Sequence, residues 1–196
     1  CRRLHEADPS HAERARDVSV GLVKFGDVLR SRNDLSGALR RYEEGLDISR
    51  RLHEADPSHA ERARDVSVDL DRIGDVRIAR NDLSGALRRY EEGLDIRRRL
   101  HAADPSHAGL ARDVSASLER IGDVLVSRND LSGALRRYEE GLDIRRPLYE
   151  ADPSHAERAR DVSLSLTKIG DVLGLRNDLS GALRRYEEGL DISRRL

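Results

Sequence analysis

Apolar residues near the start of the chain recur at intervals of three and four residues, which is the period of an amphipathic helix. The residues that show this period are Ala15, Val18, Leu22, Phe25 and Leu29. A second run follows, with small and apolar residues on one side and charged residues on the other. Its inner side consists of Ala38, Leu39, Tyr42, Gly45, Leu46, Ser49 and Leu52. We therefore predict two helices, called helix A and helix B, each with one buried face.

Asn33 and Asp34 separate the two helical patterns and mark a tight turn. Asparagine tolerates the left-handed backbone conformation that a short connection between helices requires. The second pattern begins immediately afterwards, so we expect helix B to start near Leu35 and to pair with helix A as a hairpin.

A serine followed three residues later by a glutamate precedes most copies of helix A. This is the pattern of a capping box, in which the two side chains satisfy free backbone N–H groups. The pairs are Ser10 with Glu13, Ser58 with Glu61, and Ser154 with Glu157. In the third copy Gly109 replaces the glutamate. We predict that helix A starts at these serines.

The hairpin pattern recurs every 48 residues, and the sequence RNDLSGALRRYEEGLDI returns without change at 32–48, 80–96, 128–144 and 176–192. Four units follow from this period: 5–52, 53–100, 101–148 and 149–196. Residues 1–4 match the end of a preceding helix B, so we expect an excerpt from a longer array. A fixed period of this kind indicates structural units that each complete their burial against a neighbour.

Three local features carry separate predictions. Gly37 and Gly45 cost about 1 kcal/mol each against alanine inside a helix, so we expect them to permit close contact with a neighbouring helix. Arg77 replaces an apolar residue, and its guanidinium must reach water or a carboxylate. Pro147 lies inside the third helix B, where it predicts an early end or a kink near residues 144–147.

Composition favours a thin array over a thick globule. Hydrophobic and charged residues each make up 37% of the chain, and aromatic residues only 3%. The formal net charge is −1 and no basic run is interleaved with aromatics, which disfavours a nucleic-acid partner. No apolar stretch approaches the roughly 20 residues that span a bilayer, and no signal-peptide pattern opens the chain. With the single cysteine Cys1, these features predict a soluble, cytoplasmic protein without a disulfide framework or membrane contact.

The residues Leu22-x-x-Phe25-Gly26-x-x-Leu29, Asn33-Asp34-Leu35 and Ala38-x-x-x-Tyr42-x-x-Gly45 resemble the tetratricopeptide repeat. The usual unit has about 34 residues, so the longer unit here is similar to kinesin light chain type repeats and to tandem bacterial arrays. The resemblance implies an all-α solenoid of antiparallel helical hairpins that forms a right-handed superhelix. It also implies that the helix A faces line a concave groove used for protein interactions.

The four units differ mostly along helix A, and these differences mark the candidate binding surface. The predicted partner-binding residues are Val23, Lys24, Asp27, Arg30, Asp71, Arg72, Asp75, Ile78, Glu119, Arg120, Asp123, Val126, Thr167, Lys168 and Asp171. Their alternating acids and bases suit a peptide or protein of mixed charge, or another copy of this chain. The alternative is that these are surface positions that diverged after duplication without selection.

No residue pattern predicts catalysis. Histidines recur in pairs such as His53 and His59, but each pair flanks an Asp-Pro turn, no cysteine joins them, and Tyr149 breaks the series. We interpret them as helix-end residues and predict no metal. No nucleophile lies beside a base, and no glycine-rich phosphate loop follows a strand. We expect neither an enzyme nor a cofactor nor a small-molecule substrate.

The sequence thus favours a non-catalytic interaction scaffold that binds a peptide or protein in the helix A groove. A structural array that assembles from head to tail is the alternative. It is favoured because the terminal units carry no distinct polar cap and both ends share one phase of the repeat.

Overall fold

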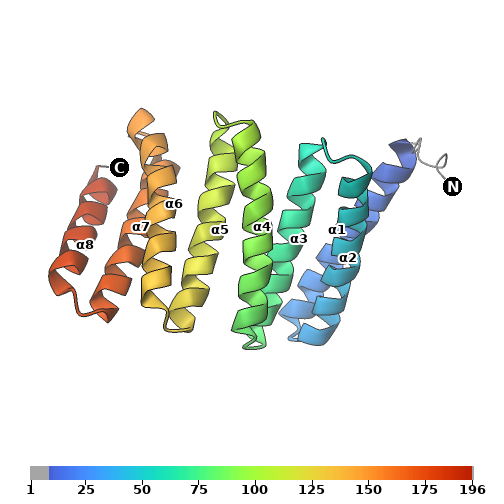
Figure 1. Cartoon of the computed structure of the whole chain (residues 1–196), viewed down its shortest axis with the longest axis horizontal. Coiled ribbons are helices and arrows are strands. Elements are labelled where there is room, and N and C mark those ends of the chain that lie inside the picture. Colours follow the sequence, from blue (N-terminus) through green and yellow to red (C-terminus); the bar gives the residue numbers. More distant parts are fainter. Residues whose placement is uncertain (1–8, 196) are drawn as a thin grey trace. The chain divides into compact units, whose positions relative to one another are not determined.

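The computed structural model describes residues 9–195, and side chains from residue 11 onwards. Within this range it contains eight helices and no strand (Figure 1). The helices are α1 (Pro9–Ser31), α2 (Leu35–Ala55), α3 (Ala60–Ala79), α4 (Leu83–Ala103), α5 (Ala108–Ser127), α6 (Leu131–Ala151), α7 (Ala156–Leu175) and α8 (Leu179–Arg194). The predicted features at residues 1–4, including Cys1, and the Ser10 side chain lie outside the described residues. The all-α prediction is confirmed: odd-numbered helices are helix A, and even-numbered helices are helix B.

The tight turn between helix A and helix B is confirmed in all four copies. The turn asparagines have φ angles of 62°, 59°, 60° and 63° at Asn33, Asn81, Asn129 and Asn177. The next residue, Asp34, caps helix α2 by accepting a hydrogen bond from the Gly37 backbone N–H at 2.8 Å. A Cβ atom at Gly37 would lie 2.3 Å from a carboxylate oxygen of Asp34. Gly37 therefore makes room for the cap, and the expectation that it serves contact with a neighbouring helix was wrong.

The predicted capping box at the start of helix A was also wrong. Helix α3 begins at Ala60, two residues after Ser58, with His59 as its N-cap. The Ser58 hydroxyl instead donates to the Asp56 carboxylate at 2.6 Å, and this hydrogen bond lowers the pKa of Asp56. The same contact joins Ser154 to Asp152 at 2.7 Å. An acceptor two residues earlier holds the serine in the Asp-Pro-Ser turn, so it is not available to cap the helix.

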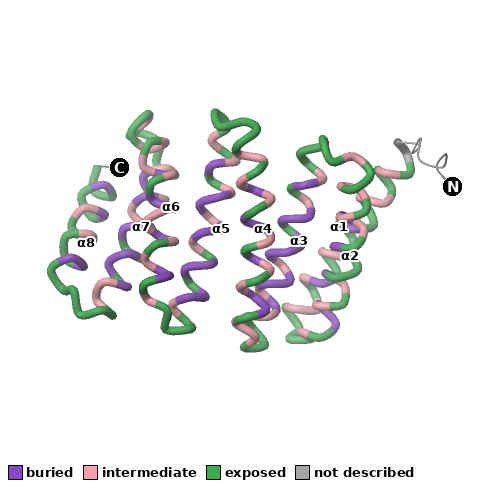
Figure 2. Tube along the Cα trace, viewed as in Figure 1, coloured by how far each residue is buried: buried purple, intermediate pink, exposed green. Residues whose placement is uncertain are grey.

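The chain divides into two compact units, residues 1–100 and 101–196. In the first unit, Ala38, Tyr42 and Leu46 of α2 pack against the buried face of α3. That face consists of Val66, Leu70, Ile73 and Val76. In the second unit, α6 packs against α7 as α2 packs against α3. Within each hairpin of this unit, α5 packs against α6 and α7 packs against α8. Figure 2 shows the resulting runs of buried residues along α3, α5 and α7.

Close helix contacts depend on two of the repeated glycines. A Cβ atom at Gly45 would lie 3.4 Å from the Ser19 hydroxyl of α1, which is the close approach expected for this position. A Cβ atom at Gly26 would lie 2.5 Å from the Tyr42 ring. The ring of Tyr42 therefore occupies the space that a side chain at residue 26 would need, and it locks α2 onto α1.

The structure confirms the prediction for Arg77 but not the early helix end predicted at Pro147. Arg77 reaches the Asp82 carboxylate at 2.6 Å, which confirms that its guanidinium finds an acid. Helix α6, in contrast, continues through Pro147 and ends at Ala151, so the predicted early end was wrong. Pro147 lies on an exposed side of the helix, where water can replace the missing backbone hydrogen bond.

Candidate functional site

A pocket of about 290 Å³ lies between α1 and α3 on the helix A surface of the first unit. Its residues are Arg16, Ser19, Val20, Val23, Lys24, Asp27, Ser49, Asp65, Val68, Asp69 and Arg72. Four of the predicted binding residues, Val23, Lys24, Asp27 and Arg72, are therefore brought together here. Three valines supply apolar wall, and charged side chains of both signs surround it.

Asp69 is the most unusual residue of this pocket. It is 4% exposed, and the Ser49 hydroxyl of α2 donates to its carboxylate at 2.6 Å. Burial raises the pKa of Asp69 to about 6, although the hydrogen bond from Ser49 opposes the shift. The sequence interpretation missed this residue. The sequence did distinguish Asp69, because it is the only acid at this position of the repeat: the other units carry Gly21, Ser117 and Ser165 there.

Ion pairs already hold the charges at the rim of the pocket. The Arg16 side chain of α1 contacts the Asp65 carboxylate of α3 at 2.7 Å. Arg72 of α3 lies 3.5 Å from the Asp27 carboxylate of α1. These pairs tie the two helices together across the pocket. They also mean that the rim acids are partly neutralised, whereas Asp69 is approached by a neutral hydroxyl.

The second unit has a corresponding cleft of about 230 Å³ between α5 and α7. It is lined by Asp123, Val126, Tyr138, Lys168, Asp171, Val172 and Leu175, four of which were predicted binding residues. The Lys168 ammonium lies 2.5 Å from Asp123 and 3.1 Å from Glu119. Burial acts to lower the pKa of Lys168, but its contacts with Asp123 and Glu119 outweigh burial and raise it. This cation is therefore held in place by two acids.

The aspartate repeated in every helix A has a structural contact. The Tyr42 hydroxyl donates to Asp27 at 2.7 Å. Equivalent bonds of 2.7, 2.6 and 2.7 Å join Tyr90 to Asp75, Tyr138 to Asp123 and Tyr186 to Asp171. This bond fastens helix A to helix B within each repeat, which accounts for an aspartate at all four positions. The invariant spacing of 15 residues was the signal in the sequence.

Asp71 and Glu119 were expected on the open helix A surface, but each is paired with an arginine of the helix B in its own repeat, and Glu119 also contacts Lys168 of α7. Asp71 contacts Arg97 of α4 at 2.7 Å, and Glu119 contacts Arg145 of α6 at 2.8 Å. Burial acts to raise the pKa of Glu119, but the charges of Arg145 and Lys168 outweigh it and lower the pKa. Where helix B carries serine instead of arginine, helix A carries a neutral residue. Those pairs are Val23 with Ser49 and Thr167 with Ser193.

The remaining predicted residues lie apart from these pockets. Arg30 contacts Asp75 at 3.2 Å, and Thr167 donates to the Ser163 carbonyl at 3.0 Å. Ile78 and Arg120 are exposed. The structure thus divides the predicted set into two groups that line pockets, a third group that makes contacts within or between repeats, and the exposed residues Ile78 and Arg120.

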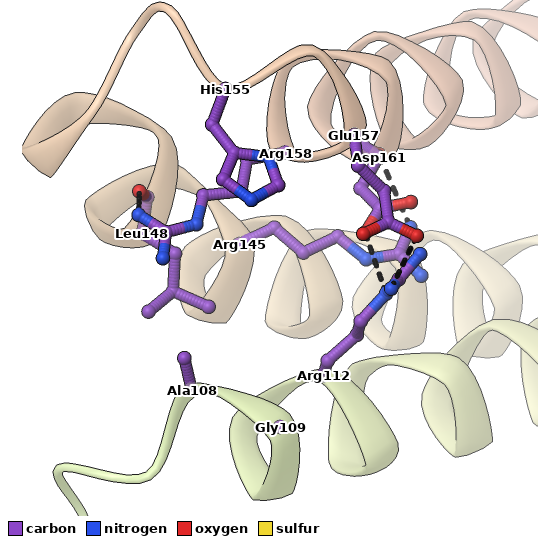
Figure 3. Close-up of a pocket in the computed structure, with 9 residues that line it drawn as sticks. All are labelled: Ala108, Gly109, Arg112, Arg145, Leu148, His155, Glu157, Arg158 and Asp161. Carbon is purple, nitrogen blue, oxygen red and sulfur yellow. Dashed lines mark hydrogen bonds and ion pairs between the residues drawn. The ribbon is translucent and has the colours of Figure 1, made fainter.

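Another pocket, of about 180 Å³, lies in the second unit between the N-terminal ends of α5 and α7 (Figure 3). Arg112 contacts Glu157 at 2.7 Å and Asp161 at 3.0 Å. Arg158 donates to the Leu148 carbonyl at 3.0 Å. Its charged groups Arg112, Glu157, Asp161 and Arg158 therefore already have partners in the fold.

Histidines lie at helix ends, as the sequence interpretation expects. His53 is in the last turn of α2, and His59 is the N-cap of α3. Among the described residues no group of three His, Cys, Asp or Glu side chains could hold a metal ion. None of the eight described helices is both long and apolar enough to cross a membrane.

Comparisons with known proteins agree on the fold. A family model described as tetratricopeptide repeat matches residues 22–61. The crystal structure of the apo form of RapI is similar over 99% of this chain and 47% of that chain, with a TM-score of 0.73 and 15% identity. BtubC (BKLC) from P. vanneervenii is similar over 89% and 62%, with a TM-score of 0.69 and 20% identity.

A de novo designed helical repeat protein, DHR64, is similar over 95% of this chain and 94% of that chain, with a TM-score of 0.51 and 21% identity. The chain spans less than two thirds of RapI and of BtubC. Comparison with curated protein sequences gave no match. At these identities the structural likeness shows the fold, an array of helical hairpins of the solenoid type.

Proposed function

Because this chain is a tetratricopeptide-repeat-like array of helical hairpins, we propose that it is a non-catalytic scaffold whose helix A surface binds a peptide or protein segment. Repeats of this type are generally protein-interaction modules. The observation that carries the proposal is the α1–α3 pocket, where apolar walls surround a buried carboxylate.

The contents of the pocket define the partner that it fits. Val20, Val23 and Val68 offer contacts to an apolar side chain. Asp69 offers a carboxylate whose hydrogen-bond partner, among the described residues, is the neutral hydroxyl of Ser49. A lysine or arginine that reached Asp69 would supply the missing positive charge and form a charge-assisted hydrogen bond. The partner we propose is therefore a segment that combines apolar and basic side chains.

Hydrogen bonds keep this site in a fixed arrangement. Ser49 donates to Asp69, and the Ser19 and Ser49 hydroxyls lie 3.0 Å apart. Ser19 also contacts the Gly45 carbonyl at 3.1 Å. Because these side chains are already ordered by three helices, binding would cost little additional conformational entropy.

Fluorescence anisotropy with short labelled peptides tests the proposal. One peptide alternates leucine with lysine, and two controls alternate leucine with glutamate or glutamine. We expect the lysine peptide to bind best, and its affinity to rise between pH 5 and pH 7 as Asp69 ionises with its pKa of about 6. The Asp69→Asn variant should lose roughly tenfold or more of this affinity, as expected for a hydrogen bond between charged groups.

Asp47→Asn is the matched control, because it makes the same chemical change on the exposed side of α2. It should bind the lysine peptide like the wild-type chain. Equal binding of the three peptides, or equal losses in the two variants, would refute the proposed site.

A further inference from the structure

We propose that the α1–α3 pocket receives an arginine side chain of its partner, and that the guanidinium takes the position which Arg145 fills in the second unit. This inference rests on the function proposed above. It names the group that the pocket selects, which is the guanidinium of arginine in preference to the ammonium of lysine.

The second unit carries its own arginine at the equivalent place. Helices α5, α6 and α7 repeat α1, α2 and α3 two periods later, and Arg145 of α6 is the equivalent of Ser49. Arg145 is 7% exposed, and Figure 3 shows its side chain extended toward Asp161. Its guanidinium donates to the hydroxyls of Ser115 and Ser165 at 3.0 and 2.7 Å, and to the Asp161 carbonyl at 3.2 Å. An arginine therefore fills the space where these three helices meet.

The first unit keeps acceptors at the same positions but carries no arginine on α2 to reach them. The residues equivalent to the three that Arg145 contacts all line the α1–α3 pocket, and they are Ser19, Asp69 and Asp65. Ser49 stands where the second unit has its arginine, and its short side chain leaves a pocket of about 290 Å³. The pocket therefore corresponds to the space that a guanidinium fills in the second unit.

The first unit also keeps an acid for the missing cation. In the second unit, Glu119 of α5 supplies the negative charge beside Arg145, at 2.8 Å. Its equivalent in the first unit is the uncharged Val23, but Asp69 of α3 brings a carboxylate to the same pocket. Asp69 is 4% exposed, and the neutral Ser49 hydroxyl donates to it at 2.6 Å. A buried acid and an open space thus lie together at the position where the second unit holds an arginine.

The acceptors favour arginine over lysine because they lie on different helices. Ser19 belongs to α1, whereas Asp69 and the Asp65 carbonyl belong to α3. A guanidinium presents five N–H donors in one plane, so it can bond to several separated acceptors at once, as Arg145 does. The ammonium of lysine carries three donors on a single atom and is more strongly hydrated. Burying it beside Asp69 would therefore form fewer hydrogen bonds at a higher cost of desolvation.

Two labelled peptides that differ only in their basic residue test this preference by fluorescence anisotropy. One alternates leucine with arginine and the other leucine with lysine, so their charge and apolar content match. We expect the arginine peptide to bind the wild-type chain about tenfold more tightly, as one or two additional hydrogen bonds would provide. Equal affinities would overturn this inference and leave the proposed function standing. If neither peptide binds, the proposed function fails and this inference fails with it.

The Ser49→Arg variant tests the pocket without a peptide. Its new guanidinium should enter the pocket and pair with Asp69, so the variant should melt at a higher temperature than the wild-type chain. It should also bind the arginine peptide at least about tenfold more weakly. Ser49→Met is the matched control, because its long side chain fills the pocket without a charge; it should block the peptide but should not raise the melting temperature. A Ser49→Arg chain that melts no higher than Ser49→Met would overturn the inference.

Asp69→Asn should have opposite effects in the two backgrounds at pH 7. In the wild-type chain it removes a buried charge, so the melting temperature should rise. In the Ser49→Arg chain it removes the acid that pairs with the new guanidinium, so the melting temperature should fall. A side chain at residue 49 that merely added bulk would not reverse the sign. The same sign in both backgrounds would therefore overturn the inference.

Discussion

The Glu119→Val variant tests whether the acids on the inner side of helix A are structural. Glu119 and Arg145 are paired at 2.8 Å, and their side chains are 20% and 8% exposed. Removing the acid leaves a buried guanidinium that keeps only neutral partners: the Ser115 and Ser165 hydroxyls and the Asp161 carbonyl. The free energy of unfolding should fall substantially for this reason.

The magnitude follows from the burial of the pair. Breaking a fully buried ion pair from one side costs about 3–5 kcal/mol. Because Glu119 is partly exposed and Arg145 retains three neutral hydrogen bonds, we expect about 2–4 kcal/mol for Glu119→Val. Arg145→Ser should cost less, about 1–2 kcal/mol, because Glu119 keeps Lys168 at 3.1 Å.

The double variant Glu119→Val with Arg145→Ser reproduces the pair that the first repeat uses, Val23 with Ser49. It should lie within about 1 kcal/mol of the wild-type chain, because no buried charge is left without a partner. Urea unfolding followed by circular dichroism measures all three variants. Glu187→Val, which removes an exposed acid of α8, is the control and should change stability by less than about 0.5 kcal/mol. The reasoning fails if Glu119→Val costs under about 1 kcal/mol, or if the double variant is as unstable as the sum of the two single variants.

Three further predictions concern single positions. The pKa of Asp69 is raised from its ordinary 3.8 to about 6, so its contribution to stability is present below pH 4 and lost as pH rises through 6. In urea unfolding, Asp69→Asn should therefore be more stable than the wild-type chain by up to about 3 kcal/mol at pH 7, and equally stable near pH 4. A difference in the free energy of unfolding that stays the same at both pH values would contradict this. Gly26→Ala should lower the free energy of unfolding by about 1–3 kcal/mol, because the new Cβ atom would meet the Tyr42 ring. Gly174→Ala should instead raise the melting temperature, because its Cβ atom would enter open space and alanine favours the helix. Asn33→Ala should lower the free energy of unfolding by about 1–2 kcal/mol, because alanine is strained at the φ of 62° that this residue adopts. Asn33→Gly should lower it much less, and similar melting temperatures for the two variants would contradict this explanation.

Local sequence signals predicted the elements of the fold because their causes are local. The left-handed turn at Asn33 needs a residue type that tolerates positive φ, and helix B begins at Leu35 immediately after it. The predicted start of helix A was wrong because the serine before it has two possible hydrogen-bond partners. Ser58 can cap a helix or bond to Asp56, and the sequence gives no measure of which contact is shorter.

The candidate site was harder to predict, because its geometry depends on contacts between helices. Variation between repeats led to the prediction that Asp71 and Glu119 bind a partner, but it could not show that their side chains contact Arg97 and Arg145. Both arginines lie 26 residues away along the chain. Asp69 was missed for the same reason: its burial depends on three helices, and its partner Ser49 belongs to the preceding repeat.

The central claim is that the α1–α3 pocket on the helix A surface binds a basic and apolar segment. Methyl NMR spectra of valine- and leucine-labelled protein, recorded during titration with the leucine–lysine peptide, test it most directly. The account predicts that shifts concentrate on the methyl groups of Val20, Val23 and Val68, and that Asp69→Asn removes them. Shifts that leave these three valines unchanged, or that persist unaltered in Asp69→Asn, would contradict it.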